Sequence, residues 1–316
     1  MLVSQAVAGD VRREYAKALF TADLKLYNFY SEYKYGLRYC AATFPELTGD
    51  VEKASVILSE LLDGAAASIR ARYAAEFDFV QHDAVRLQAI QEDVGAVPSP
   101  KDACTGQIAE LVQYKEQGMP LGLERIVLLH TDRYAQHPEY VFDDEHVLPV
   151  QYAWAVNGRK RTCTVRIPAT WEKEATLGAS RTQTYRSALG YGVPFFSLQA
   201  VSDSQHMDAA AVQDDLRWRT SVAALQQEYG IVETLAGGMQ QVGTVPGAWV
   251  IFRSEGTPAQ PSGYYYNWYL RVGDSVLQYC SGVNEDSISG ELTQESMFKK
   301  YYQTLREIAL STVVHE

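Results

Sequence analysis

The first third of the chain carries apolar residues at intervals of three and four, the spacing of amphipathic helices. One such stripe covers residues 11–37 and ends before Pro45, because a proline disfavours helical backbone at the residue before it. Two further helical patterns follow, at 51–90 and 100–117. The spacing therefore predicts an all-helical domain over residues 1–117.

Beyond Gly118 the helical spacing gives way to runs rich in β-branched and aromatic residues, bounded by turn residues. Asn157-Gly158 lies between two such runs and predicts a tight β-hairpin. The strands expected from these runs are 150–156, 162–167, 193–200, 231–241, 248–254, 264–272 and 275–283.

Two helical patterns interrupt the predicted strands, at 208–229 and 293–312. In the first of them, Trp218 and Val222 fall on the apolar stripe with Leu225, so we expect these side chains to face inward. Antiparallel hairpins mixed with helices predict an α+β sandwich over residues 147–316. Residues 118–146 then form a connecting segment, which we expect to be loop.

The order of these elements resembles a known family. The hairpin that enters Cys163–Trp171, the helix that ends at Gln227–Gly230, the strand at 242–252, the paired strands at 264–280 and the closing helix through Leu305 resemble the PsbP-like α/β/α sandwich. The resemblance covers residues 147–316 and leaves out the N-terminal helices. It implies a non-catalytic fold that binds a partner peptide on a sheet face or in a groove.

The charge of the chain excludes two classes of partner. Its 28 Lys and Arg residues against 39 Asp and Glu residues give a net charge of -11, which repels phosphate backbones and anionic lipid surfaces. No stretch approaches the ~20 apolar residues that span a bilayer. We therefore expect neither nucleic-acid binding nor membrane insertion.

Four cysteines lie far apart, with no Cys-x-x-Cys pair. Their even number, two in each half of the chain, suggests one disulfide per domain in an oxidising compartment; the alternative is four buried thiols in a reducing one. The pairs expected are Cys40 with Cys104 and Cys163 with Cys280. Geometry requires the chain between the first pair to fold back, at Gly64 or near Gln81–Asp83.

Few residues suggest catalysis or metal binding. Histidines and acids gather between His130 and His146, but the spacing of metal sites is lacking, and Pro138 and three adjacent acids favour an exposed acidic loop. Nucleophile and phosphate-loop motifs are absent from the sequence. We expect no enzyme activity, no metal and no cofactor. A catalytic triad assembled from distant residues remains an alternative.

The run Tyr264–Tyr269 alternates large aromatic residues on both of its faces. One face must be core, so the residues of the other, Tyr265, Asn267 and Tyr269, are candidates for partner binding. On this hypothesis alanine at Tyr265 or Tyr269 would weaken partner capture and leave the melting temperature nearly unchanged. The alternative is that helices cover both faces.

Together these features predict a non-catalytic binding or assembly protein of the bacterial cell envelope that binds a protein or peptide partner through its C-terminal sandwich. Two alternatives stay open: a hydrolase-like enzyme with a site between the domains, and an antagonist of a secreted toxin. The run Ala6-Val7-Ala8 has the small-x-small form that precedes signal-peptide cleavage sites. We therefore expect a periplasmic or secreted protein, with a cytoplasmic one as the alternative.

Overall fold

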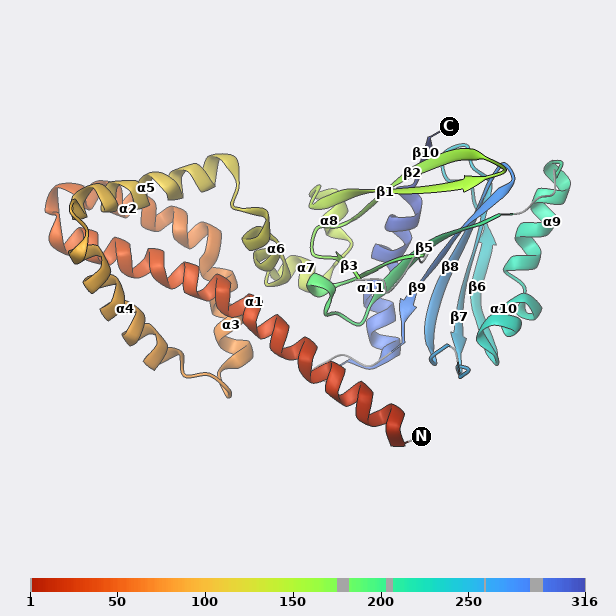
Figure 1. The fold of residues 1–316 in the computed structure, drawn as a ribbon, viewed down its shortest axis with the longest axis horizontal. Coiled ribbons are helices and arrows are strands. Elements are labelled where there is room, and N and C mark those ends of the chain that lie inside the picture. The colour runs from red at the N-terminus through yellow and green to blue at the C-terminus, as the bar shows by residue number, and fades with distance from the viewer. Residues whose placement is uncertain (1, 175–181, 203–206, 259, 285–291, 316) are drawn as a thin grey trace. The chain divides into compact units, whose positions relative to one another are not determined.

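The computed structural model describes residues 2–174, 182–202, 207–258, 260–284 and 292–315, with side chains from residue 13 onward. The chain forms two compact units. Residues 17–135 make up a helical unit, and residues 1–16 with 136–316 make up a unit that contains all the described strands. Figure 1 shows the order of the elements along the chain.

The helical unit follows the apolar spacing of the sequence. A long first helix is followed by shorter helices joined by tight turns, and α5 lies against both α2 and α4. The helices are α1 (Leu2–Thr43), α2 (Thr48–Leu58), α3 (Gly64–Tyr73), α4 (Phe79–Ala96), α5 (Pro100–Gln117), α6 (Leu121–Leu129) and α7 (Asp132–Gln136), with one π-helical turn at Ser59–Asp63 and a short 3-10 helix at Pro45–Leu47.

The chain reverses between α3 and α4, at residues 74–78, which is neither of the two places expected from the sequence. The turn ends at Asp78, which is the N-cap of α4. Its carboxylate accepts hydrogen bonds of 3.0 Å from the backbone N–H groups of Val80 and Gln81. The helical spacing continues through this turn in the sequence, so the spacing over 51–90 does not show where the chain folds back.

This reversal brings the start of α5 back to the end of α1. Cys40 and Cys104 are joined by a disulfide across a sequence separation of 64 residues, with their Cα atoms 5.7 Å apart. The first predicted pair is therefore confirmed. In the chain-entropy model a loop of this length contributes about 4 kcal/mol of stability.

The tyrosines of α1 are mostly buried inside the helical unit, and their hydroxyl groups reach carboxylates of other helices. Tyr27 donates to Asp83 on α4 at 3.0 Å, and Tyr33 donates to Glu110 on α5 at 2.5 Å. Burial and these carboxylates raise the pKa of both phenols well above the usual range. The phenols therefore remain protonated at neutral pH and act as hydrogen-bond donors that tie α1 to its neighbours.

Residues 118–146 are largely helical, which corrects the expectation of a loop. They form α6, α7 and a short α8 (Tyr140–Asp143). The residues from Leu121 to Leu129 supply an apolar stripe whose Leu123, Ile126 and Leu128 are buried. His130, which we placed in an exposed acidic loop, follows α6 directly and is buried as well.

The second unit holds two antiparallel sheets. The predicted Asn157-Gly158 hairpin joins β1 (Val147–Val156) to β2 (Arg159–Pro168), and β2 also pairs with β10 (Val313–His315). A seven-stranded sheet has the order β3-β4-β5-β9-β8-β7-β6. Its strands are β3 (Glu172–Lys173), β4 (Gln183–Arg186), β5 (Phe195–Ser202), β6 (Val232–Met239), β7 (Gly247–Ser254), β8 (Gly263–Val272) and β9 (Ser275–Val283).

Helices cover both faces of the seven-stranded sheet. On one side, α11 (Gln294–Leu310) packs against β8 and β9; on the other, α9 (Ala209–Arg219) packs against β7 and β8 and is followed by α10 (Val222–Tyr229). Figure 1 shows these helices on opposite sides of the sheet. A helical N-terminal region and an antiparallel sheet flanked by helices are the predicted fold class, which is confirmed.

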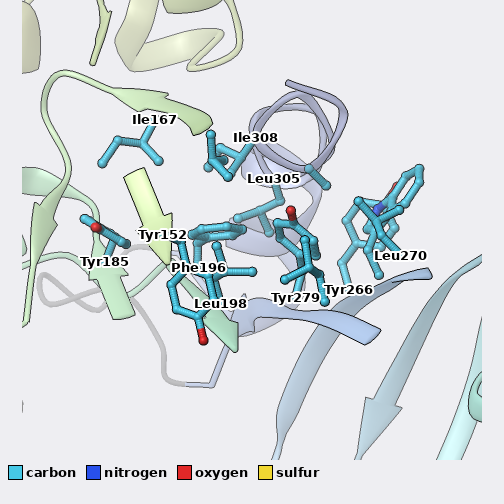
Figure 2. Packing of buried hydrophobic residues seen from close by; sticks show 14 of the residues in the cluster. Tyr152, Ile167, Tyr185, Phe196, Leu198, Tyr266, Leu270, Tyr279, Leu305 and Ile308 are labelled. Atoms are coloured by element: carbon cyan, nitrogen blue, oxygen red, sulfur yellow. The ribbon is translucent and has the colours of Figure 1, made fainter. Parts of the chain in front are cut away.

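The larger core of this unit lies between the two sheets and α11. Figure 2 shows Leu305 and Ile308 of α11 above Phe196 and Tyr279 of the seven-stranded sheet. Cys163 of β2 belongs to this core. The alternation of inward and outward side chains along each strand places these residues, as the sequence pattern predicted.

The second predicted disulfide is wrong, because Cys163 and Cys280 are not bonded. Tyr279 points into the larger core, so its neighbour Cys280 points to the opposite face of β9, where it packs against a second, smaller core. The seven-stranded sheet therefore separates the two sulfur atoms. Burial raises the pKa of both thiols to about 12, which leaves them almost entirely protonated at neutral pH.

Candidate partner-binding surface

The three residues proposed for partner binding lie inside the smaller core. Tyr265, Asn267 and Tyr269 are 1, 0 and 4% exposed. Leu225 and Tyr229 of α10, with Leu216 of α9, form the helical side of this core. The prediction of an open aromatic face is therefore wrong, and the alternative, helices on both faces, describes the structure.

Asn267 is a polar group in this core and is held by two phenols. Its Nδ2 atom donates to the hydroxyl oxygens of Tyr229 and Tyr269 at 3.1 and 3.3 Å. Tyr229 in turn donates to the Cys280 sulfur at 3.3 Å. This chain of hydrogen bonds joins α10 to β8 and β9, so these residues fix the helix on the sheet.

The break between α9 and α10 changes which side chains face outward. Where the sequence predicted one helix, Ser221 has an extended backbone and its hydroxyl accepts a hydrogen bond from the N–H of Ala224, which starts α10. Because Ser221 is not helical, the apolar side chains of α10 do not continue the apolar stripe of α9 on the same face. Leu225 remains inside, but Trp218 and Val222 are 52 and 45% exposed, contrary to the expectation that they face inward.

Exposed large apolar residues continue from this break into β6. Contacts join α9 to α10 and α10 to β6, so the three elements form one continuous border of the sandwich. We call the exposed apolar side chains of this border the α9–β6 surface: Trp218, Val222, Ile231, Leu235 and Met239. Single exposed apolar residues are ordinary, whereas several on adjoining elements make this border a candidate binding surface.

A second arrangement with chemical potential lies in the helical unit. Asp23 on α1 accepts a hydrogen bond of 2.8 Å from Nε2 of His130, whose Nδ1 lies 3.0 Å from the hydroxyl oxygen of Ser68 on α3. The other oxygen of Asp23 accepts from Tyr73 at 2.8 Å and from Arg72 at 3.2 Å. Sequence reasoning missed this cluster, since its members come from three distant helices.

The order serine, histidine, aspartate is that of a nucleophilic triad. In this unit, however, the side chains of Asp23 and His130 have no solvent exposure, and Ser68 lies in the middle of α3. Attack on a substrate needs an open position beside the nucleophile and donors for the developing oxyanion. The geometry instead suits a buried carboxylate whose three donors join α1, α3 and α6.

Comparisons with known proteins add resemblances at the level of the fold. No family model and no curated protein matches the chain. The solution structure of cyanobacterial PsbP (CyanoP) from Synechocystis sp. PCC 6803 is similar at 11% identity and a TM-score of 0.37, over 53% of this chain and 92% of that one. The Ran-binding protein Mog1p of Saccharomyces cerevisiae is similar at 11% identity and a TM-score of 0.35, over 53% and 95%.

A protein from Bacteroides thetaiotaomicron VPI-5482 is similar at 12% identity and a TM-score of 0.30, over 49% of this chain and 45% of that one. The fold class given above rests on the described strands and helices themselves. Among the described helices, none combines the length and the apolar character that crossing a bilayer requires.

Proposed function

We propose that the protein is a non-catalytic binding or assembly protein of the cell envelope, and that it holds a protein partner at the α9–α10 part of the α9–β6 surface. The observation that carries this proposal is the exposure of Trp218 at the break between the two helices. Tryptophan is among the residues that contribute most to binding when an interface buries them.

Two other features support the proposed compartment and the kind of partner. The Cys40–Cys104 disulfide suits an oxidising compartment outside the cytoplasm. The net charge of -11 favours a partner surface that is neutral or basic. The buried positions of Tyr265 and Tyr269 give them the role of core residues that hold α10 in place.

Trp218→Ala is expected to weaken partner capture about thirtyfold, the loss of roughly 2 kcal/mol typical of an aromatic anchor, without lowering the melting temperature. The wild-type protein and the variant are immobilised, and the proteins they retain from a lysate of the source organism are quantified by mass spectrometry. Gln213→Ala, an exposed change on the same helix, is the matched control and should retain the wild-type set.

Equal capture by Trp218→Ala and the wild type would contradict the proposal. If a protein is retained, its activity separates an assembly role from antagonism of a toxin. An antagonist would abolish the activity of the protein that it retains.

A further inference from the structure

The two edges of the seven-stranded sheet differ sharply. One edge is β3, which has two residues, Glu172 and Lys173, both charged and exposed. The other is β6, which has eight residues with a single charge, Glu233, and neither lysine nor proline. Soluble proteins usually protect an edge by making it short or charged, as at β3. The edge at β6 is four times as long and carries only one charge.

The backbone of β6 shows which of its groups face the open side. Gln240 N donates to Gly247 O at 2.9 Å and Glu255 N donates to Ile231 O at 3.0 Å, so both ends of the strand are bonded to β7. In an antiparallel pair the residues bonded to the neighbour alternate with those turned away. Counting inward from each end, the residues whose N–H and C=O groups face the open edge are Val232, Thr234, Gly237 and Met239.

One extra residue, Leu235, sits between these two pairs, because the register of β6 against β7 shifts between Thr234 and Ala236. A regular strand presents bonding groups at every second residue, so it can match one side of this bulge but not both. A strand with the same bulge, running antiparallel, matches both sides. Val232 then lies opposite Met239, and Thr234 opposite Gly237.

We propose that the partner of β6 is a second copy of this chain, paired antiparallel about a twofold axis between Leu235 and Ala236. The strand then meets its own bulge, and every edge-facing residue of one copy finds an edge-facing residue of the other. The same bulge disfavours pairing with unrelated regular strands. The two seven-stranded sheets become one continuous sheet in a closed, isologous dimer.

The side chains fit this pairing. Glu233 lies opposite Gly238 of the other copy, so the two carboxylates do not face each other, which avoids a destabilising cross-strand contact. Leu235, 49% exposed in the single chain, lies beside the axis with Leu235 of the other copy. Gly237 and Gly238 carry no side chain that would shield the backbone on the approach of a second strand.

Thr234→Pro tests the pairing, because it removes an edge-facing N–H and leaves the β6–β7 bonds in place, and each dimer carries the change twice. Sedimentation equilibrium across a wide concentration range should show a dimer for the wild type. For Thr234→Pro the association constant of the dimer should be at least about tenfold lower. Thr234→Val, which keeps the N–H, should associate like the wild type.

Leu235→Asp places two like charges beside the twofold axis and should also give monomers. If Thr234→Pro fails to fold, Leu235→Asp alone tests whether β6 pairs with β6 of a second copy. Trp218→Ala should remain dimeric even if partner capture is lost, which separates this inference from the proposed function. A monomeric wild type, or a dimer that survives both Thr234→Pro and Leu235→Asp, overturns the proposal.

Discussion

Replacing Asp23 by alanine is expected to destabilise the helical unit by about 3 to 5 kcal/mol, the usual cost of removing one partner from a buried ionic network. The carboxylate is fully enclosed and accepts hydrogen bonds from His130, Tyr73 and Arg72. Without it, the imidazole and the phenol lose their acceptor inside the protein, where water cannot replace it. Differential scanning calorimetry, which can follow the two units separately, measures the loss.

Ser68→Ala is the matched control for this prediction, because it removes the group at the other end of the same chain of hydrogen bonds. It deletes one bond of a half-buried hydroxyl and should cost only about 1 kcal/mol. If Asp23→Ala costs no more than Ser68→Ala, the carboxylate does not hold the three helices together and the structural role given to it is wrong.

Tyr265→Ala is expected to cost the strand-containing unit about 3 to 5 kcal/mol, as other large-to-small changes at buried aromatic residues do. Its ring stacks on Phe252 at 5.4 Å between centroids and contacts Tyr229 at 5.1 Å, and its hydroxyl donates to the carbonyl of Pro261 at 2.6 Å. The melting temperature of this unit should fall by about 10 °C or more.

Tyr265→Phe keeps the ring and removes only the hydroxyl, so it should cost about 1 kcal/mol. The difference between the two variants measures the packing of the ring in the smaller core. A melting temperature unchanged by Tyr265→Ala would restore the interpretation drawn from the sequence alone, in which this side chain faces a partner.

The sequence was sufficient to predict the elements that are long and have a clear pattern of residue types. Long strands such as β8 and β9 are runs of ten and nine residues, bounded by turn residues and rich in aromatic or β-branched side chains, and both appear where those runs predicted them. The short strands β3, β4 and β10 were missed, because two to four residues hold too few alternations to be recognised. Their pairing depends on neighbouring strands that are distant in the sequence.

The errors at the site have a common physical origin, which is that sequence spacing does not show where an element breaks or what covers it. Thr220 is the C-cap of α9 and Ser221 is the N-cap of α10. A helix break predicted at these two residues would have placed Trp218 and Val222 on the exposed surface. The aromatic strand looked too rich for a core, yet α9 and α10 bury it. Likewise, Cys163 and Cys280 both lie in predicted strands, but only the packing of the two cores shows that their side chains lie on opposite sides of the seven-stranded sheet.

The proposed function requires the partner to contact the break between α9 and α10 and not the rest of the sandwich. Site-specific photo-crosslinking tests it most directly, with p-benzoylphenylalanine placed at Val222, beside Trp218, or at Val201 on β5, which is similarly exposed at 37% against 45%. We expect a crosslinked partner from position 222 and none from position 201. A crosslink from position 201 alone, or from neither position while the wild type still captures its partner, would contradict the account.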